Sequence, residues 1–215
     1  MSIDVRAPVL REPPLGTAIF WTRYRVAAAL GGGPRGPEPF GRVWTDSRTL
    51  LLGDVFVALS GERFDGHDHL AASVDAGAAG VVVSDARRAV GLGVPAYLVP
   101  DTRAALGALA RYHRRAWGGT VIGIVGANGK TTTKELLRAA LGSRLEVHAT
   151  VANYNNLIGV PLTLLQMPRH SDVAVVEMGT NAPGEIAALR AIAEPDIVVV
   201  TSIAEEHLEG LGDLA

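Results

Sequence analysis

The stretch "VIGIVGANGKTTTKELL", Val121–Leu137, joins an uninterrupted apolar run to a glycine-rich turn and then to a run of threonines. The apolar run is typical of a strand buried on both faces of a parallel sheet. Gly126 and Gly129 let the backbone turn sharply and bring its N–H groups close to phosphate oxygens. Lys130 supplies a positive charge, and Thr131 supplies a hydroxyl for Mg²⁺ at the start of a helix whose dipole favours an anion. The order of these features predicts a phosphate-binding loop.

The match to the strict loop pattern is incomplete, because Ile124 stands where G-x-x-x-x-G-K-[ST] has its first glycine. A glycine turn that merely joins a strand to a helix is the simpler alternative. The complete order of strand, glycines, Lys-Thr and helix nevertheless favours phosphate binding. We expect consecutive loop residues to bind the nucleotide, namely Gly126, Ala127, Asn128, Gly129, Lys130, Thr131 and Thr132.

Two later segments repeat the apolar pattern, "DVAVVEMG" at residues 172–179 and "DIVVVTSI" at 196–203, with helical segments between the three runs. Strands alternating with helices predict a doubly wound, mostly parallel α/β sheet. In such a sheet, ligands bind at the carboxyl ends of the strands, which is where the candidate polar residues lie. We assign residues 119–215 to this phosphate-binding unit.

Residues 26–118 read as a small α/β domain, because short β-rich runs such as "DVFVAL" and "GVVVSD" alternate with helical stretches. Asp101 is placed to cap the domain's last helix, and Arg111, Arg114 and Arg115 oppose the helix dipole near its end. The pair Gly118-Gly119 then predicts a domain boundary.

The opening segment to about Thr17 is rich in proline and charge, so we expect residues 1–25 to form a poorly ordered tail. The run "RYRVAAALGG" predicts a short helix that is closed by Gly31 and Gly32.

Composition excludes several classes of protein. The formal net charge of -2 argues against bulk attraction to nucleic acid or anionic lipid. The absence of cysteine excludes disulfides, thiolate metal sites and a cysteine nucleophile. No apolar run approaches the roughly 20 residues of a membrane-spanning helix, and the amino terminus lacks the features of a signal peptide. We therefore expect a cytoplasmic protein.

The motif G-x-N-G-K-T-T after an apolar strand resembles the Mur ligase superfamily, whose members use ATP to join an amino acid or peptide to a carboxylate. The continuation "TTTKELL" resembles the MurF type, which joins D-alanyl-D-alanine to UDP-N-acetylmuramoyl-tripeptide. "TDSRTLLLGDVFVALSGERFDGHDH", "NYNNLIGVPLTLL", "VVEMGTNAPGEI" and "HLEGLG" agree with this in order and spacing. The resemblance covers the chain from about Val26 to its end.

The chain departs from the MurF pattern at a few positions. Ala182 replaces the histidine of "NHPGEI", and Glu205 and Glu206 stand where small or apolar residues are commoner. The family continues through the rest of the central domain and a carboxy-terminal domain, whereas this chain ends at "GDLA". The resemblance therefore predicts that residues 26–118 form an amino-terminal UDP-substrate-binding domain and that residues 119–215 form a truncated central ATP-binding domain. Such a chain is expected to bind the UDP-linked substrate without completing ligation alone.

Two amino-terminal motifs are candidates for the UDP pocket. "TDSR" reads by itself as a capped turn, but the resemblance implies that Ser47 and Arg48 face the UDP moiety. "DGHDH" could be a metal pair of His67 and His69 or a turn, and we favour a turn in which Asp65 and His67 line the pocket. His113, which lies beside arginines on a helix, is expected at the surface.

Glu177 ends a buried strand, where an unpaired carboxylate is costly and a cation relieves the cost. Thr131 and Glu177, with ATP, would give Mg²⁺ the oxygen ligands that it prefers. His207 follows the next strand, and the resemblance places it near a second metal.

The segment "NYNN" offers side-chain amides, although turn formation explains it equally well. The resemblance implies that Asn153, Asn155 and Asn156 lie near the nucleotide and the acceptor carboxylate, and it places Asn181 and Glu185 similarly. The catalytic candidates are then Lys130, Asn153, Asn156 and His207. A MurE-type ligase that adds a single amino acid and a non-catalytic nucleotide-binding module remain as alternatives.

Overall fold

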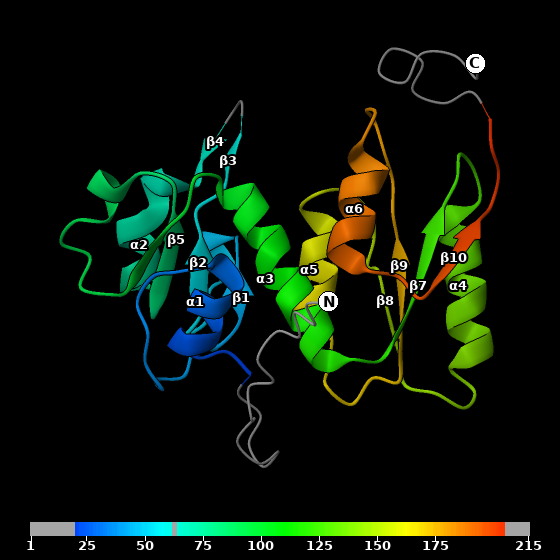
Figure 1. The fold of residues 1–215 in the computed structure, drawn as a ribbon, viewed down its shortest axis with the longest axis horizontal. Coiled ribbons are helices and arrows are strands. Elements are labelled where there is room, and N and C mark those ends of the chain that lie inside the picture. The colour runs from blue at the N-terminus through cyan, green and yellow to red at the C-terminus, as the bar shows by residue number, and fades with distance from the viewer. Residues whose placement is uncertain (1–19, 62–63, 205–215) are drawn as a thin grey trace, which may run out of the picture.

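The computed structural model describes residues 20–61 and 64–204, which form two parallel sheets with helices around them (Figure 1). The first sheet has the strand order β1-β2-β5-β6, and every neighbouring pair is parallel. Its strands are β1 Val43–Trp44, β2 Val55–Val57, β5 Gly80–Val83 and β6 Ala96–Leu98. A short antiparallel hairpin, β3 Ser60–Gly61 with β4 Phe64–Asp65, follows β2.

The helices of this first part are α1 Arg23–Leu30, α2 Leu70–Asp75 and α3 Thr102–Trp117, with 3-10 turns η1 Ser47–Thr49, η2 Gly66–His69 and η3 Ala86–Ala89. The expected closing glycine of α1, Gly31, and the expected cap of α3, Asp101, are confirmed. Thr22 and Gly31 bound α1, while Asp101 accepts hydrogen bonds from the first turn of α3, which Gly118 closes at φ 75°.

The second sheet has the order β10-β7-β9-β8, and it too is parallel throughout. Its strands are β7 Thr120–Val125, β8 Val147–Ala149, β9 Val173–Glu177 and β10 Ile197–Val200. Figure 1 shows α4 Lys130–Leu141 on one side of this sheet and α5 Gly159–Leu165 with α6 Glu185–Ala193 on the other, between the sheet and α3. The predicted α/β fold with mostly parallel sheets is confirmed.

Helix α3 contributes side chains to the apolar cores of both sheets. Leu106 and Leu109 belong to a core with the first sheet, whereas Ala110 lies in the core of the second. Leu162 of α5 joins the first core. Because apolar contacts cross the position of Gly118-Gly119, the predicted boundary between two domains stays a prediction.

Two expectations about exposure are wrong. Residues 20–25 belong to the packed structure rather than to a tail, since Phe20 and Trp21 are 8% and 3% exposed and α1 begins at Arg23. His113 is 5% exposed rather than at the surface. Its Nδ1 lies 2.9 Å from the carbonyl oxygen of Leu164, and burial lowers its pKa to about 4. Residues 1–19 lie outside the described residues.

Candidate functional site

The predicted phosphate-binding loop lies between β7 and α4. Gly126 has φ 135° and Gly129 has φ 85°, conformations that side chains rarely adopt. A Cβ on Gly126 would also meet the side chain of Thr201 and the backbone of Ser202. Glycine is therefore required at Gly126 by backbone conformation and by close packing alike.

The residues that directly follow β10 hold the loop by hydrogen bonds. Ser202 accepts hydrogen bonds from the N–H groups of Ala127 at 3.0 Å and Asn128 at 2.8 Å. Thr201 Oγ1 donates to the carbonyl oxygen of Asn128 at 2.6 Å. No sequence motif had marked these two residues, because the contact joins segments that are far apart in the chain.

The first backbone hydrogen bond of α4 runs from the N–H of Thr133 to the carbonyl oxygen of Gly129 at 2.9 Å. The N–H groups of the helix's first turn therefore point out of its amino terminus, where the helix dipole favours an anion. Lys130 Nζ lies across the loop and donates to the carbonyl oxygens of Gly126 at 2.5 Å and Ala127 at 2.9 Å. The loop thus combines backbone donors with an ammonium, as phosphate binding requires.

A cavity of about 240 Å³ lies beside the loop, and its lining includes Lys130, Thr180, Ile186 and Ser202. Its walls come from β7, from α6 and from the segment after β10, so it sits at the carboxyl end of the second sheet. This is where ligands bind in doubly wound sheets.

Glu177 ends β9 and is 3% exposed. Its Oε2 accepts a hydrogen bond from Thr131 Oγ1 at 3.0 Å, and its Oε1 accepts one from Asn155 Nδ2 at 3.0 Å. The hydroxyl and carboxylate that were expected to share a metal are thus brought together. Oxygen ligands of this kind suit Mg²⁺, which completes its coordination with water and phosphate oxygens.

Two buried residues that the sequence analysis missed support Glu177. Thr150 is 3% exposed, and its Oγ1 accepts the N–H of Glu177 at 2.9 Å. Lys134 is 2% exposed, and its Nζ donates to the carbonyl oxygen of Thr150 at 2.9 Å. Lys134 is part of the segment "TTTKELL". Its partner Thr150, however, directly follows β8 and belongs to no motif.

The asparagines of "NYNN" have separate positions. Asn155 contacts Glu177 directly, and its carbonyl oxygen also accepts the N–H of Gly179 at 2.7 Å. Asn156 Oδ1 accepts the N–H groups of Ile158 and Gly159 and so caps the start of α5. Asn153 is exposed. Catalytic roles for Asn153 and Asn156 stay predictions.

At the start of α6, the carboxylate of Glu185 accepts the N–H groups of Asn181 at 2.7 Å and Ala182 at 3.2 Å. These bonds lower the pKa of Glu185, and the bond from the N–H of Asn181 has the largest effect. The ligand contacts predicted for Asn181 stay a prediction. His207, Glu205 and Glu206 lie outside the described residues.

The candidates for the UDP pocket follow β1 and β2. Asp46 caps η1 and holds Arg48 by bonds of 2.9 Å to Nε and 2.7 Å to Nη2, which lower the pKa of Asp46 to about 2. The Arg48 side chain is 85% exposed, and Ser47 beside it is half-buried. Figure 1 shows the β3–β4 hairpin and the β7–α4 loop on the same side of the molecule.

His67 is buried and hydrogen-bonded at both ring nitrogens. Its Nε2 accepts the N–H of Ser84 at 2.9 Å, so the neutral ring carries its proton on Nδ1, which lies 2.7 Å from Asp65 Oδ1. Asp65 also accepts the N–H of His67, and this bond is the first cause of its lowered pKa of about 2. The turn expected here is the 3-10 helix η2, whereas UDP contacts for Asp65 and His67 stay predictions.

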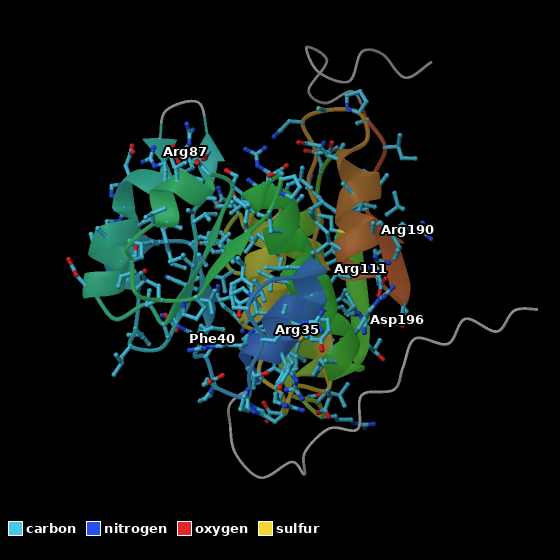
Figure 2. The ribbon with its side chains drawn as sticks, turned by 60° about the vertical axis from the view of Figure 1, so that its left-hand side comes forward. Arg35, Phe40, Arg87, Arg111, Arg190 and Asp196 are labelled. Carbon is cyan, nitrogen blue, oxygen red and sulfur yellow. The ribbon has the colours of Figure 1, made fainter. Side chains whose placement is uncertain are left out.

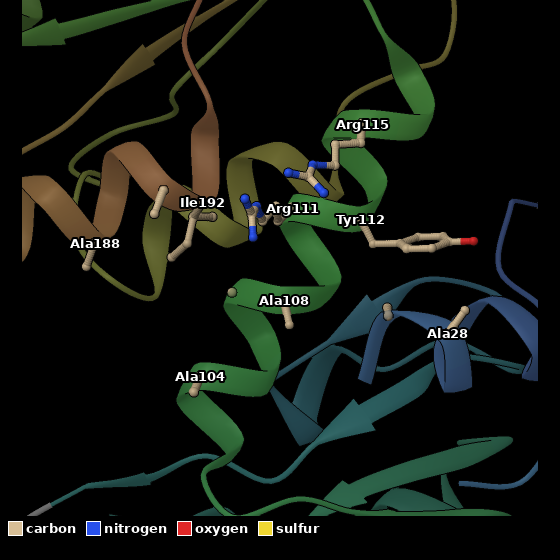
Figure 3. A pocket seen from close by; sticks show the side chains of 11 residues that line it. Ala28, Ala104, Ala108, Arg111, Tyr112, Arg115, Ala188 and Ile192 are labelled. Atoms are coloured by element: carbon tan, nitrogen blue, oxygen red, sulfur yellow. The ribbon is translucent and has the colours of Figure 1, made fainter. Parts of the chain in front are cut away.

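A second cavity, of about 510 Å³, lies between α1, α3 and α6 (Figure 3). Small residues line much of it, and at one end Arg111 and Arg115 bind the carboxylate of Glu194 at distances of 2.6 to 2.8 Å. Figure 2 shows Arg111 and Asp196 on one side of the molecule. This cavity shares no lining residue with the cavity beside the loop, so it is separate from the phosphate site.

Within the described residues, no helix is both long and apolar enough to cross a membrane. Nor do those residues contain a group of three or more histidine, cysteine, aspartate or glutamate side chains that could hold a metal ion. A metal at Glu177 would therefore depend on the Thr131 hydroxyl, phosphate oxygens and water.

Two parts of the chain match known families. Residues 41–114 match the family described as "Mur ligase family, catalytic domain", and residues 124–215 match "Mur ligase middle domain". The curated UDP-N-acetylmuramoyl-tripeptide--D-alanyl-D-alanine ligase of Bacillus subtilis is 44% identical over 170 residues, which cover 79% of this chain and 37% of that protein. The chain thus spans little more than a third of that relative's length.

Solved structures that resemble this chain are of the same type as the curated relatives. MurF from Acinetobacter baumannii superimposes with a TM-score of 0.82 at 35% identity and covers 87% of this chain and 42% of that one. MurF ligase from Thermotoga maritima in complex with ADP gives a TM-score of 0.71 at 36% identity, covering 78% of this chain and 38% of that one. The chain therefore belongs to the Mur ligase family, and the relatives and structures that it resembles here are ligases of the MurF type.

Proposed function

We propose that this chain forms the UDP-substrate-binding and ATP-binding parts of a MurF-type ligase, which adds D-alanyl-D-alanine to UDP-N-acetylmuramoyl-tripeptide in peptidoglycan precursor synthesis. The observation that carries the proposal is the buried Glu177 carboxylate, which is bonded to Thr131 directly behind the Lys130 loop. The names of the relatives and the ADP-bound neighbour support it. We place the reaction in the cytoplasm, where ATP is available.

The reaction has two steps. The terminal carboxylate of the UDP-linked tripeptide attacks the γ-phosphorus of ATP, which releases ADP and leaves an acyl phosphate. The neutral amine of D-alanyl-D-alanine then attacks the acyl carbon, and inorganic phosphate leaves with the bonding electron pair. The amide forms as the nitrogen loses one proton to the leaving phosphate or to water. The first attack needs no general base, because the carboxylate is already ionised, whereas the second needs a neutral amine.

The residues of the loop serve this chemistry by placement and charge neutralisation. Lys130 and the N–H groups at the start of α4 would bind the phosphates, and they bring positive charge to the place where two anions must meet. Thr131 and Glu177 fit Mg²⁺ by the chemistry of their oxygen atoms, and bound Mg²⁺ would reduce the repulsion between carboxylate and phosphate.

The first sheet would hold the other substrate. Arg48 presents an exposed, planar guanidinium, which Asp46 fixes at the carboxyl end of β1. A guanidinium can bind two oxygen atoms of a diphosphate at once. The further proposed contacts to the UDP-linked substrate are Ser47, Asp65, His67 and, from the loop between β9 and α6, Asn181.

Calorimetric titration of the chain tests the proposal and separates it from the alternatives. We expect binding of Mg·ATP and, independently, of UDP-N-acetylmuramoyl-tripeptide. A chain that binds the UDP-linked dipeptide more tightly than the tripeptide would instead be of the MurE type. Binding of ATP without either UDP-linked ligand would indicate a nucleotide-binding module, and binding of no ligand would contradict every form of the proposal.

A further inference from the structure

Lys134 is a buried cation with no part in the proposed chemistry. It lies on α4 one turn after Thr131, and its side chain is 3% exposed. Removing an ammonium from water is costly unless hydrogen bonds and opposite charge compensate for the loss. Its ammonium donates to the carbonyl oxygen of Thr150 at 2.9 Å and lies 3.3 Å from the half-exposed carboxylate of Glu135.

Thr150 connects Lys134 to the second sheet through three different atoms. Its carbonyl oxygen accepts from Lys134, its N–H donates to the carbonyl oxygen of Val175 at 3.0 Å, and its Oγ1 accepts the N–H of Glu177 at 2.9 Å. A hydrogen bond to a charged donor is stronger than one between neutral groups. Lys134 therefore contributes the strongest of the bonds that fix Thr150.

The contacts form a closed ring. Lys134 holds Thr150, Thr150 holds the backbone of Glu177, and the Glu177 carboxylate accepts from Thr131 at 3.0 Å. Thr131 and Lys134 are three positions apart on α4, so they lie on the same face of the helix. Helix α4 is thus bonded to the end of β9 both directly and through Thr150.

The chain that leaves Thr150 also returns to this ring, because Asn155 donates to the other oxygen of Glu177 at 3.0 Å. Displacement of Thr150 would therefore move the backbone of Glu177 and the start of the segment that carries Asn155. Both changes would alter the direction in which the carboxylate faces Thr131.

We propose that Lys134 is a positioning residue, which holds Glu177 through Thr150 in the orientation that binds the metal of Mg·ATP. The proposal rests on the proposed function for the identity of the ligand, whereas the orientation of Glu177 can be measured without any ligand. Among the described residues, Lys134 Nζ contacts Thr150 and Glu135 rather than Glu177, so the proposed effect on Glu177 passes through Thr150.

The test compares Lys134→Met with the control Arg138→Met. Methionine keeps the apolar stem of the lysine but leaves the Thr150 carbonyl without its charged donor. Arg138 lies one turn further along α4, is 60% exposed and shares Glu135 as a partner. Thr150→Val, which removes the acceptor for the Glu177 N–H, breaks the same path at its second link, so the proposal can still be overturned if Lys134→Met does not fold.

The first readout is amide hydrogen exchange in the absence of nucleotide. We expect the N–H of Glu177 to exchange about tenfold faster in Lys134→Met and in Thr150→Val, while amides of β7 keep their rates. Arg138→Met should match the unchanged chain. Unchanged exchange at Glu177 in a folded Lys134→Met or Thr150→Val protein would overturn the positioning role.

The second readout is the Mg²⁺ concentration at which ATP binding is half-maximal. It should rise about tenfold in Lys134→Met, as expected for the loss of one buried charge-assisted bond, and change less than about twofold in Arg138→Met. Equal Mg²⁺ dependence in Lys134→Met and the unchanged chain would overturn the inference. Failure of the unchanged chain to bind ATP would contradict the proposed function, and the exchange result would then still decide whether Lys134 orients Glu177.

Discussion

Thr131 Oγ1 donates a hydrogen bond of 3.0 Å to Glu177 Oε2 and so joins the first turn of α4 to the end of β9. The two residues are 46 positions apart in the chain. The sequence predicts that these two residues, with ATP, share one Mg²⁺. Their contact brings the two proposed oxygen ligands together beside the predicted phosphate loop.

Glu177→Gln should remove most of the Mg²⁺ dependence of ATP binding, because the amide keeps the size of the side chain but not its charge. We expect ATP affinity in saturating Mg²⁺ to fall about tenfold or more, while affinity without Mg²⁺ stays the same or rises. The measurement is a pair of ATP titrations, with Mg²⁺ and with a chelator. A Mg²⁺ titration identical to that of the unchanged chain would show that Glu177 is not a ligand.

Gly126→Ala should impair the loop, because alanine is strained at φ 135° and its Cβ would press on Thr201 and Ser202. We expect a loss of about 1 to 3 kcal/mol in the free energy of unfolding, together with weaker ATP binding. The control is Gly91→Ala, where φ is 80° but no atom lies within 4 Å of the new Cβ. Equal effects at both positions would show that close packing against the β10 segment contributes nothing.

Because His113 is buried, we expect the folded protein to lose stability in mild acid. Burial lowers its pKa from 6.5 to about 4, so the unfolded chain binds a proton before the folded protein does. Stability from this group is complete above about pH 6.5 and is lost as the pH falls towards 4, by up to about 3 kcal/mol. In denaturant unfolding at pH 7, 6, 5 and 4, His113→Asn should flatten the slope in this interval. A slope that His113→Asn leaves unchanged would assign it to other groups, such as His148, whose pKa burial also lowers.

Glu194 should cause a second loss of stability, at lower pH. It has φ 43° at the end of α6, and its carboxylate binds Arg115 and Arg111, which lower the pKa of Glu194 from 4.5 to about 2. Since a depressed carboxylate stabilises the fold above its unfolded pKa, this contribution is present above about pH 4.5 and is lost as the pH falls towards 2. The side chain is 28% exposed, so screening reduces the expected contribution to about 1 kcal/mol.

The control for Glu194→Gln is Glu146→Gln, at an exposed glutamate that directly precedes β8, on the opposite edge of the second sheet. Glu194→Gln should lower stability at pH 7 and remove the slope between pH 4.5 and 2, whereas Glu146→Gln should do neither. Identical unfolding curves for the two variants would mean that the arginines of α3 do not stabilise the end of α6.

The sequence predicted best those features that adjacent residues determine. The strand β7, the glycine turn, α4 and the cap at Asp101 each follow from short local patterns, and the structure has them where expected. The contact between Thr131 and Glu177 followed from a general rule, since strand ends in a parallel sheet lie on one edge, whereas a metal held by the two stays a prediction.

Features that depend on distant segments could not be read in the same way. His113 is buried because α5 lies against α3 and places the Leu164 carbonyl 51 positions away beside its ring. Phe20 and Trp21 follow a proline-rich segment, yet they pack against α3, and Trp21 stacks on His113. Lys134 is one of only two lysines in the sequence, but its burial depends on β8, which brings Thr150 to its ammonium.

The most direct test of the account is a double comparison of Lys130→Ala and Arg48→Ala by calorimetry, because the two proposed ligand sites belong to different sheets. Lys130→Ala should weaken Mg·ATP binding about 100-fold, as expected for loss of an ammonium on phosphate, and leave the affinity for UDP-N-acetylmuramoyl-tripeptide unchanged. Arg48→Ala should do the reverse. If Lys130→Ala binds Mg·ATP as tightly as the unchanged chain, or if Arg48→Ala keeps its full affinity for the UDP-linked substrate, the corresponding site is not where the account places it.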